Sequence, residues 1–255
     1  MSRTLRLDPS LPLVWRTPDS FQVGVNPAIA IIDSLDSRFL PVLSALRTGI
    51  SEEGCEAIAS HEGITPENTR TFLSALGEVL LHKNPEPLPR VAITGSTGNH
   101  RVFSQVWAQL GHTLVANPRD AHPADETFVL SNFVLQPSAY QPWISRDLRH
   151  TPVIFSDQAI TVGPRVTPGE GPCLGCAWDN ESRREPALVA LASQLTAHTA
   201  ATDTPAFHAL AAWHARELVE TDTPGLTLRI DRYTRRTTSH VEEASARCAC
   251  RSLED

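Results

Sequence analysis

The sequence contains only one lysine, Lys83, so arginine supplies nearly all of its 22 basic residues. Its 29 acidic residues give a formal net charge of −7, without the basic excess that binds nucleic-acid phosphates. It has no run of about 18 apolar residues, the length that a membrane-spanning helix needs. Its first residues, MSRTLRLDPS, lack the apolar segment of a secretory signal. These absences argue against nucleic acid as the main partner and against a membrane span, and they predict a cytoplasmic protein.

Hydrophobic residues make up 41% of the 255 residues, which is enough for a buried core. The stretch HKNPEPLPR, residues 82–90, contains three prolines, and a helix cannot cross it. We therefore predict a first module at 1–82, a proline-rich linker at 83–90 and a second domain at 91–255. The sequence shows no internal repeat and no low-complexity tract.

Alternating apolar residues, followed by apolar residues at helical spacing, predict a small sheet and three helices in the first module. We expect strands at 11–16, 20–25 and 28–32, and helices at 35–49, 51–63 and 65–81. Ser51 and Thr65 are suited to cap the second and third helices, and Pro66 suits a first helical position. Two short helices joined by a tight turn beside a sheet resemble a winged helix-turn-helix.

The second domain alternates strand-like and helix-like segments. We expect strands at 89–95, 112–117, 126–133, 151–157 and 226–233, a hairpin at 159–169, and helices at 99–111, 138–150, 183–198 and 205–220. Strands separated by helices are typical of parallel βαβ units. The pattern therefore predicts a doubly wound, Rossmann-like α/β domain.

Four of the five cysteines form two tight pairs, Cys173 with Cys176 and Cys248 with Cys250. Two such pairs can supply the four thiolates that zinc prefers, and a closed set of four makes a structural site. A redox pair at 173/176, or buried thiols without a shared role, are the alternatives. Cys55 lies on the apolar face of an expected helix, where it reads as a small buried hydrophobe.

A glycine turn, RVAITGSTGNHRVF, stands where a dinucleotide fingerprint would stand, between a first strand and a helix. The fingerprint Gly-x-Gly-x-x-Gly begins correctly at Gly95, but Thr97 and His100 replace its second and third glycines. Gly98 does not restore the pattern, so a structural turn is favoured over a nucleotide site. The histidines are scattered and form no catalytic arrangement, so we assign no catalytic residue.

Two resemblances follow from these motifs. RVAITGSTGNHRVF, ETFVLSNF, TPVIFSD and VGPRVTPGEGPCLGC, in that order, resemble the ThiF-like superfamily of ubiquitin-activating and sulfur-carrier-activating adenylyltransferases. The resemblance covers about residues 88–255 and implies a Rossmann-like ThiF-type domain with zinc on the two cysteine pairs. It also implies nucleotide contacts at Gly95, Gly98 and Asn132. The family's Asp-Asn strand end reads Ser131-Asn132 here, and this lost carboxylate argues against ATP as a cofactor.

The first module, from LPLVWRTPDSFQVGV onward, resembles the leader-peptide recognition modules of ribosomal peptide biosynthesis. Together with a ThiF-like domain, it resembles the partner protein of thiazole/oxazole (bacteriocin) cyclodehydratases from actinobacteria. The resemblance implies two partners, a precursor leader peptide and a separate cyclodehydratase enzyme that uses ATP. It leaves a homodimer open.

Three functions compete: a leader-peptide-binding scaffold with a degenerate activating-enzyme domain, a working adenylyltransferase, and a winged-helix DNA-binding regulator. Residues 51–81 contain six acids and one base, which would repel DNA from the helix-turn-helix. The scaffold is therefore the first hypothesis, and it makes the protein more a binding partner than an enzyme.

An extended peptide can add a strand to an open sheet edge. We expect that edge at 28–32, with contacts from Ala28, Ile29, Ala30 and Ile31. The groove wall would be the face of the 65–81 helix not used by Phe72, Leu73 and Leu76, with Glu67 and Arg70 at the site. Acids such as Glu67 and Glu78 would favour a peptide with basic residues. The alternative is that the module packs on the second domain or on another subunit.

Overall fold

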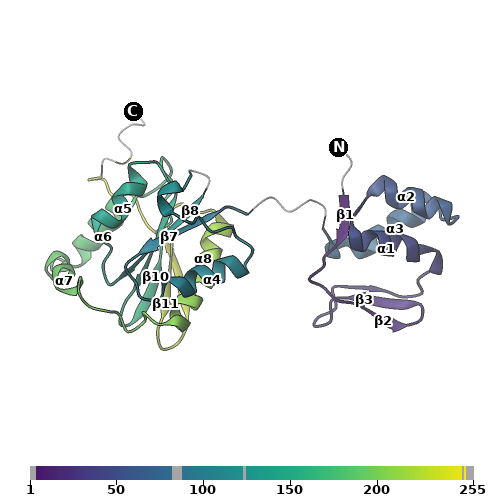
Figure 1. Ribbon diagram of the computed structural model, residues 1–255, viewed down its shortest axis with the longest axis horizontal. Coiled ribbons are helices and arrows are strands. Elements are labelled where there is room, and N and C mark those ends of the chain that lie inside the picture. Colours follow the sequence, from purple (N-terminus) through teal and green to yellow (C-terminus); the bar gives the residue numbers. More distant parts are fainter. Residues whose placement is uncertain (1–3, 82–87, 123–124, 249, 251–255) are drawn as a thin grey trace. The chain divides into compact units, whose positions relative to one another are not determined.

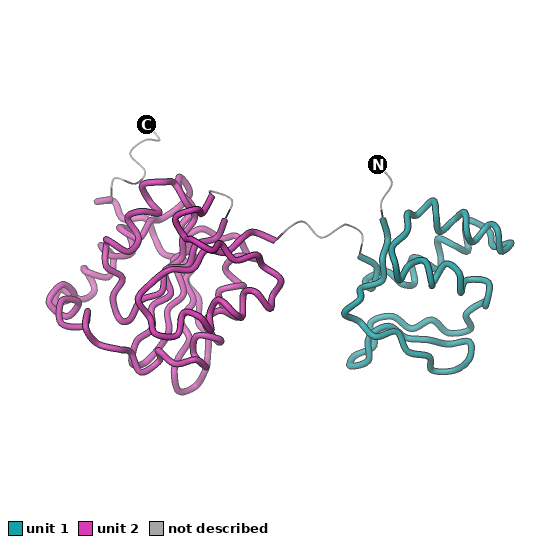
Figure 2. Tube along the Cα trace, viewed as in Figure 1, with its two compact units in different colours: residues 1–87 teal, residues 88–255 magenta. Residues whose placement is uncertain are grey.

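The computed structural model describes residues 4–81, 88–122, 125–248 and 250. The chain divides into two compact units, residues 1–87 and 88–255 (Figure 2). Most of the linker expected at 83–90 lies in residues 82–87, outside the described residues. Each unit has a hydrophobic core of its own.

Unit 1 combines three helices with two small antiparallel sheets (Figure 1). The strands are β1 (Thr4–Leu7), β2 (Leu13–Thr17), β3 (Ser20–Val23), β4 (Ala30–Ile32), β5 (Ile50–Ser51) and β6 (Leu80–Leu81). The helices are α1 (Leu40–Thr48), α2 (Glu52–His61) and α3 (Pro66–Leu76), with 3-10 turns η1 (Ser37–Phe39) and η2 (Gly77–Val79). The sheet orders are β5-β1-β6 and β2-β3-β4.

The expected caps of α2 and α3 are confirmed. The side chain of Ser51 accepts a hydrogen bond from the Gly54 amide at 3.0 Å, and Thr65 accepts one from the Asn68 amide at 3.3 Å. The third helix was expected to run to residue 81, but α3 ends at Leu76. Gly77 takes φ +26°, and the chain then turns into β6, which pairs with β1. The pairing strand β1 is too short to show in the sequence pattern.

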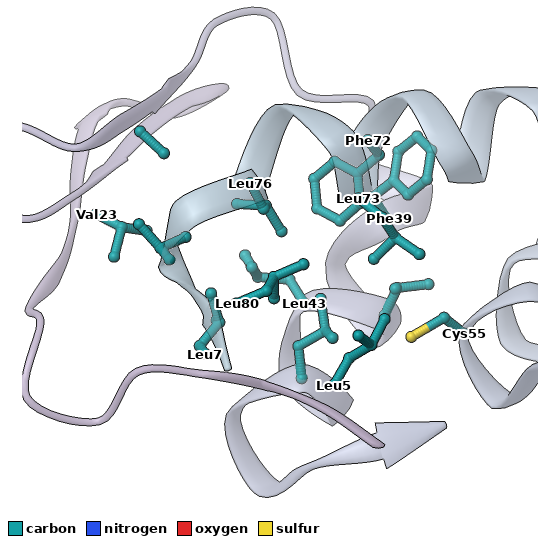
Figure 3. Packing of buried hydrophobic residues seen from close by; sticks show 14 of the residues in the cluster. Leu5, Leu7, Val23, Phe39, Leu43, Cys55, Phe72, Leu73, Leu76 and Leu80 are labelled. Carbon is teal, nitrogen blue, oxygen red and sulfur yellow. The ribbon is translucent and has the colours of Figure 1, made fainter. Parts of the chain in front are cut away.

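The core of unit 1 lies between the helices and both sheets (Figure 3). Phe39 and Phe72 stack at 4.4 Å between ring centroids, and burying each ring contributes about 1.5–3 kcal/mol. Cys55 is fully buried in this core, where burial, followed by the charge of Glu52, raises the pKa of its thiol to about 11. Such a thiol is a packing group, as the sequence indicates.

Unit 2 is built on a six-stranded mixed sheet of order β12-β11-β10-β9-β8-β7. Its strands are β7 (Val91–Gly95), β8 (Glu126–Asn132), β9 (His150–Phe155), β10 (Ala159–Val162), β11 (Leu226–Asp231) and β12 (Thr237–Val241). The expected parallel βαβ units are present in β7, β8 and β9, whereas β10, β11 and β12 join the sheet antiparallel. Residues 156–158 join β9 to β10, and so short a connection permits only an antiparallel pair.

Helices cover both faces of this sheet (Figure 1). One face carries α4 (His100–Gln109) and α8 (Pro205–Thr221), and the other carries α5 (Pro137–Ile144) and α6 (Leu174–Arg184), after which α7 (Leu188–Leu195) follows. The helix expected at 183–198 is found only over α7, and the sequence reading missed α6, which begins at the first cysteine pair. No helix among the described residues is long and apolar enough to cross a membrane.

The strand expected at 112–117 is reduced to one parallel bridge between Leu114 and Val91. Asn117 caps the 3-10 turn η3 (Pro118–Asp120), and Pro118 cannot donate to a neighbouring strand. The extended segment that begins at residue 112 therefore ends at Asn117. Strand β12, in contrast, is present although the sequence did not predict it. Its sequence TTSHV lacks an apolar alternation, and the strand is defined by its pairing with β11.

Candidate functional site

The two cysteine pairs meet in unit 2. The four sulfur atoms of Cys173, Cys176, Cys248 and Cys250 all lie within 4.8 Å of one another. The closest pairs, Cys173 with Cys248 and Cys176 with Cys250, have sulfur separations of 3.5 Å. A tetrahedral zinc with Zn–S bonds of about 2.3 Å holds its sulfurs about 3.8 Å apart. The cluster therefore has the donor set and spacing of a four-thiolate metal site.

The first turn of α6 shapes this cluster. Cys173 is the residue that precedes the helix, and Cys176 is the third residue of the helix and is fully buried. A Cβ atom at Gly175 would lie 3.3 Å from the sulfur of Cys173 and 3.5 Å from that of Cys248. A glycine here leaves room for the two pairs to approach each other. Four thiolates would fill the coordination sphere and leave no open position for chemistry.

Hydrogen bonds outside the cluster also tie the second pair to α6. The hydroxyl of Ser245 donates to Asp179 at 2.6 Å, and Arg247 donates to the same carboxylate. Asn180 donates to Glu242 at 2.6 Å and to the carbonyl of Glu243 at 2.8 Å. These contacts preset the position of residues 242–248 beside the helix, so the metal would bind to thiols already brought together.

Protonation of the cluster is uneven. Burial opposes ionisation of Cys176, but hydrogen bonds from the backbone of Ser245 and Cys173 and from neighbouring thiols lower its pKa. Burial raises the pKa of Cys173. The hydrogen bonds around Cys176 thus act in the same direction as metal binding, which requires the thiolate.

Among the described residues, β4 pairs with β3 on one side only, which leaves its other side as an open sheet edge of unit 1. Gly24 donates its amide to Pro12, on the β2 side, at 2.9 Å. Because successive residues of a strand face opposite neighbours, Phe21 and Val23 bond toward β4. The N–H and C=O of Ile31 then face away from β3, and the residue is 46% exposed. Ile31 can bond to a further strand.

A groove of about 370 Å³ runs beside this edge, between β4 and α3. Its lining residues come from the β4–α1 segment and from one face of α3: Ile31, Ile32, Asp33, Ser34, Leu35, Asp36, Phe39, Asn68, Thr71, Phe72 and Ala75. Phe72 lines the groove, although the sequence suggested a wall without it. Ala30 is buried, Ala28 is partly buried, and Ile29 is 44% exposed and donates its amide to Val23.

The charged residues expected at the peptide site lie elsewhere on α3. Neither Glu67 nor Arg70 lines the groove, and Arg70 instead points to Glu56 of α2, with 3.7 Å between the charged atoms. The carboxylates of the groove are Asp33 and Asp36. Asp36 already binds Arg38 at 2.6 Å, which lowers the pKa of the carboxyl.

The glycine turn follows β7 at the carboxyl edge of the parallel strands. Gly95 has φ +135°, and a Cβ atom there would lie 2.0 Å from the carbonyl oxygen of Leu130 in β8. This glycine is thus required by the close approach of two strands, whatever the turn binds. Thr97 is buried beside it, and its hydroxyl is without a hydrogen-bond partner among the described residues.

A buried network, which sequence reasoning missed, converges on Asp203 in front of the same turn. Its carboxylate accepts hydrogen bonds from the Gly98 amide at 3.3 Å, from Asn99 at 3.1 Å and from Asn132 at 2.9 Å. His208 of α8 lies 2.8 Å from it through Nε2. Asp203 is 105 residues from Gly98, so no local signal could have linked them.

The structure therefore defines an α/β unit with a six-stranded mixed sheet and a cysteine cluster, preceded by a small unit of helices and sheets. No protein-family model matches this chain, and no characterised protein matches it in sequence. Solved structures do match. A heterocyclase in complex with substrate and cofactor matches with a TM-score of 0.63 and 15% identity, over 97% of this chain and 39% of that one. This chain thus spans about two fifths of the heterocyclase chain.

Two further solved structures match over nearly their whole length. A chain of the E. coli microcin synthetase McbBCD complex with pro-MccB17 bound has a TM-score of 0.60 and 15% identity, over 97% of this chain and 99% of that one. E. coli MccB with AMPCPP and MccA has a TM-score of 0.52 and 10% identity, over 96% and 98% of the two chains. These likenesses establish a fold shared with heterocyclase and microcin-synthetase proteins.

Proposed function

We propose that this chain is a partner protein in the modification of a ribosomally made precursor peptide. Unit 1 binds the leader of the precursor, a separate cyclodehydratase performs the chemistry, and unit 2 is an activating-enzyme-like domain that does not adenylate. The observation that carries the proposal is the free edge of β4 beside the groove on α3. The fold shared with the substrate-bound heterocyclase and with the microcin synthetase complex supports it.

The edge and the groove together suit an extended peptide. Ile31 offers one outward N–H and one outward C=O to the peptide backbone, while the groove offers apolar surface from Leu35, Phe39 and Phe72. Backbone bonding supplies affinity, and the groove selects side chains at alternate positions. The carboxylate of Asp33 is 72% exposed but already lies 3.6 Å from the guanidinium of Arg16, so a basic side chain of the peptide would share it with that arginine.

Calorimetry of the full chain with the leader of a precursor encoded beside the gene tests this binding. Ile31→Pro removes the outward donor and should weaken binding about tenfold or more, because a net hydrogen bond contributes about 1 kcal/mol and the ring adds a clash. Ile31→Ala keeps the donor and should lose less affinity. Equal losses in both variants, or no binding by the folded wild-type chain, would refute the proposal.

We also propose that the cysteine cluster holds one structural zinc. The donor set of four sulfurs, their spacing and the room left by Gly175 support this metal. When bound, zinc would cross-link α6 to residues 242–250 and would take no part in a reaction. Metal analysis of freshly purified protein should find about one zinc per chain.

The second candidate is an adenylyltransferase, since MccB was solved with AMPCPP in a similar fold. ATP–pyrophosphate exchange tests it directly and should stay at background. Gly95→Ala is unsuitable as its control, because the added carbon would collide with β8 whether or not nucleotide binds. Exchange clearly above background would favour this candidate over the scaffold.

A further inference from the structure

The carboxyl edge of β7 and β8 is the place where α/β domains bind nucleotides. In such domains a phosphate lies against the turn between the first strand and the following helix, where backbone N–H groups point toward it. Here that turn runs from Gly95 to Asn99, and α4 begins at His100. The N–H of Gly98 points to the carboxylate of Asp203 at 3.3 Å.

The surroundings of Asp203 are those of a bound anion. Its carboxylate faces four nitrogen groups, from Gly98, Asn99, Asn132 and His208, at 2.8 to 3.3 Å. Its side chain is 2% exposed. A carboxylate, like a phosphate, only accepts hydrogen bonds, so this cradle of donors suits either anion.

The loop that carries Asp203 is anchored to the ends of the parallel strands. The amide of Ala200 donates to the side chain of Asn132 at 3.1 Å. Thr202 donates both its amide, at 3.2 Å, and its hydroxyl, at 2.7 Å, to the carbonyl of Ser156 after β9. The ring of His208, which contacts the Asp203 carboxylate, stacks on Phe155 with centroids 4.0 Å apart. The carboxylate is thus held in the cradle from several sides.

We propose that Asp203 is a built-in anion that takes the place of a nucleotide phosphate at the Gly95–Asn99 turn and keeps unit 2 closed to nucleotides. An incoming phosphate would have to expel a buried carboxylate and break its contacts, and until then two like charges would repel each other. The Asn132 side chain, which a nucleotide site would use, serves this internal anion instead. The proposal concerns unit 2 alone and does not depend on peptide binding by unit 1.

Calorimetry with inorganic pyrophosphate and with ATP tests this proposal on the full chain. The wild-type chain should show no saturable binding of either probe at millimolar concentration. Asp203→Gly empties the cradle, and its affinity for pyrophosphate should rise at least tenfold above any wild-type binding. Asp157→Asn is the matched control, because Asp157 is an exposed acid two residues after the end of β9, and its replacement should leave pyrophosphate affinity unchanged.

Amide NMR of the intact chain provides a second readout, whose wild-type arm needs no variant. Adding pyrophosphate to the wild type should leave the Gly98 amide and the Asn132 side-chain signals unmoved. Thr202→Val keeps Asp203 but loosens its loop, so in this variant the same signals should shift with pyrophosphate. Saturable shifts in the wild type would overturn the proposal. So would a folded Asp203→Gly chain whose Gly98 signal and pyrophosphate affinity match those of Asp157→Asn.

Discussion

His208 is fully buried, yet only one of its two ring nitrogens has a partner among the described residues. Burial lowers the pKa of this histidine, against the opposing effect of Asp203, so the ring is neutral and donates through Nε2. Burial alone would raise the pKa of Asp203, but hydrogen bonds from Asn132, Asn99, His208 and Gly98 lower it. The pair is therefore a single negative charge held by neutral donors.

This pair makes the stability of unit 2 depend on pH. A neutral buried histidine gains a proton when the chain unfolds, so stability falls as the pH drops below about 6.5, the usual histidine pKa. His208→Gln keeps an N–H donor without the titration, and its melting temperature should fall less than that of the wild type between pH 7 and 5.5. Scanning calorimetry at both pH values measures this difference.

The exposed His198 is the matched control for that comparison. His198→Gln should keep the wild-type pH dependence. Some dependence should survive in His208→Gln, because His150 is also buried with a lowered pKa. A wild-type slope retained in full by His208→Gln would contradict the assignment of the charge to Asp203. Protonation of Asp203 itself adds a further loss only below about pH 4, where carboxylates titrate.

At the scale of elements, α6 and the segment after β12 depend on the cysteine cluster. Cys176→Ser removes a ligand and should reduce the zinc content to near zero, with loss of the metal's contribution to folding. Cys55→Ser places a hydroxyl in the apolar core of unit 1 and should cost about 1–3 kcal/mol, with zinc content unchanged. Metal analysis and thermal melts of the two variants measure both effects.

The two serine variants are matched in chemistry and differ only in place. Full zinc content in Cys176→Ser would show that the cluster does not hold the metal. Loss of zinc in Cys55→Ser would show instead that the metal depends on the core of unit 1, which the cluster geometry does not predict.

The groove on α3 can be filled without touching the core. Ala75 lines it and is exposed, so Ala75→Arg should fold normally and weaken leader binding about tenfold by blocking the groove and removing apolar contact. Ser74→Arg, the neighbouring exposed position outside the groove lining, should leave the affinity unchanged. Fluorescence anisotropy with a labelled leader measures both. If Ser74→Arg proves the more damaging change, the peptide must lie on another face of α3.

Local sequence signals predicted most helices and strands, but they did not predict pairings between residues far apart in the chain. The caps at Ser51 and Thr65 are readable because each bonds to an amide three residues away. The cysteine pairs are readable because metal ligation has a chemical signature. The second neighbour of β10 is β11, which follows three helices later, and the Asp203 cradle joins the distant segments around Gly98, Asn132 and Asp203. Periodicity carries no information on such contacts.

At the scale of the whole molecule, the two units have separate cores, so a change in one unit should lower the unfolding temperature of that unit alone. Removing zinc with a chelator should lower the unfolding temperature of unit 2. Leu76→Ala, in the core of unit 1, should cost about 2–5 kcal/mol there. Scanning calorimetry should resolve two transitions that respond separately. One transition that moves as a whole under both changes would contradict two independent folding units.

The chain order of the sheet also has a consequence for how unit 2 folds. The β9–β10 hairpin closes over three residues, whereas β11 returns only after α6, α7 and α8. The entropy of loop closure grows with the length of the loop, so β11 should dock late and Cys248 should meet Cys173, 75 residues away, later still. Until then the thiols of Cys173 and Cys176 stand open to oxidation, which makes a newly made chain more vulnerable to oxidants than the finished protein.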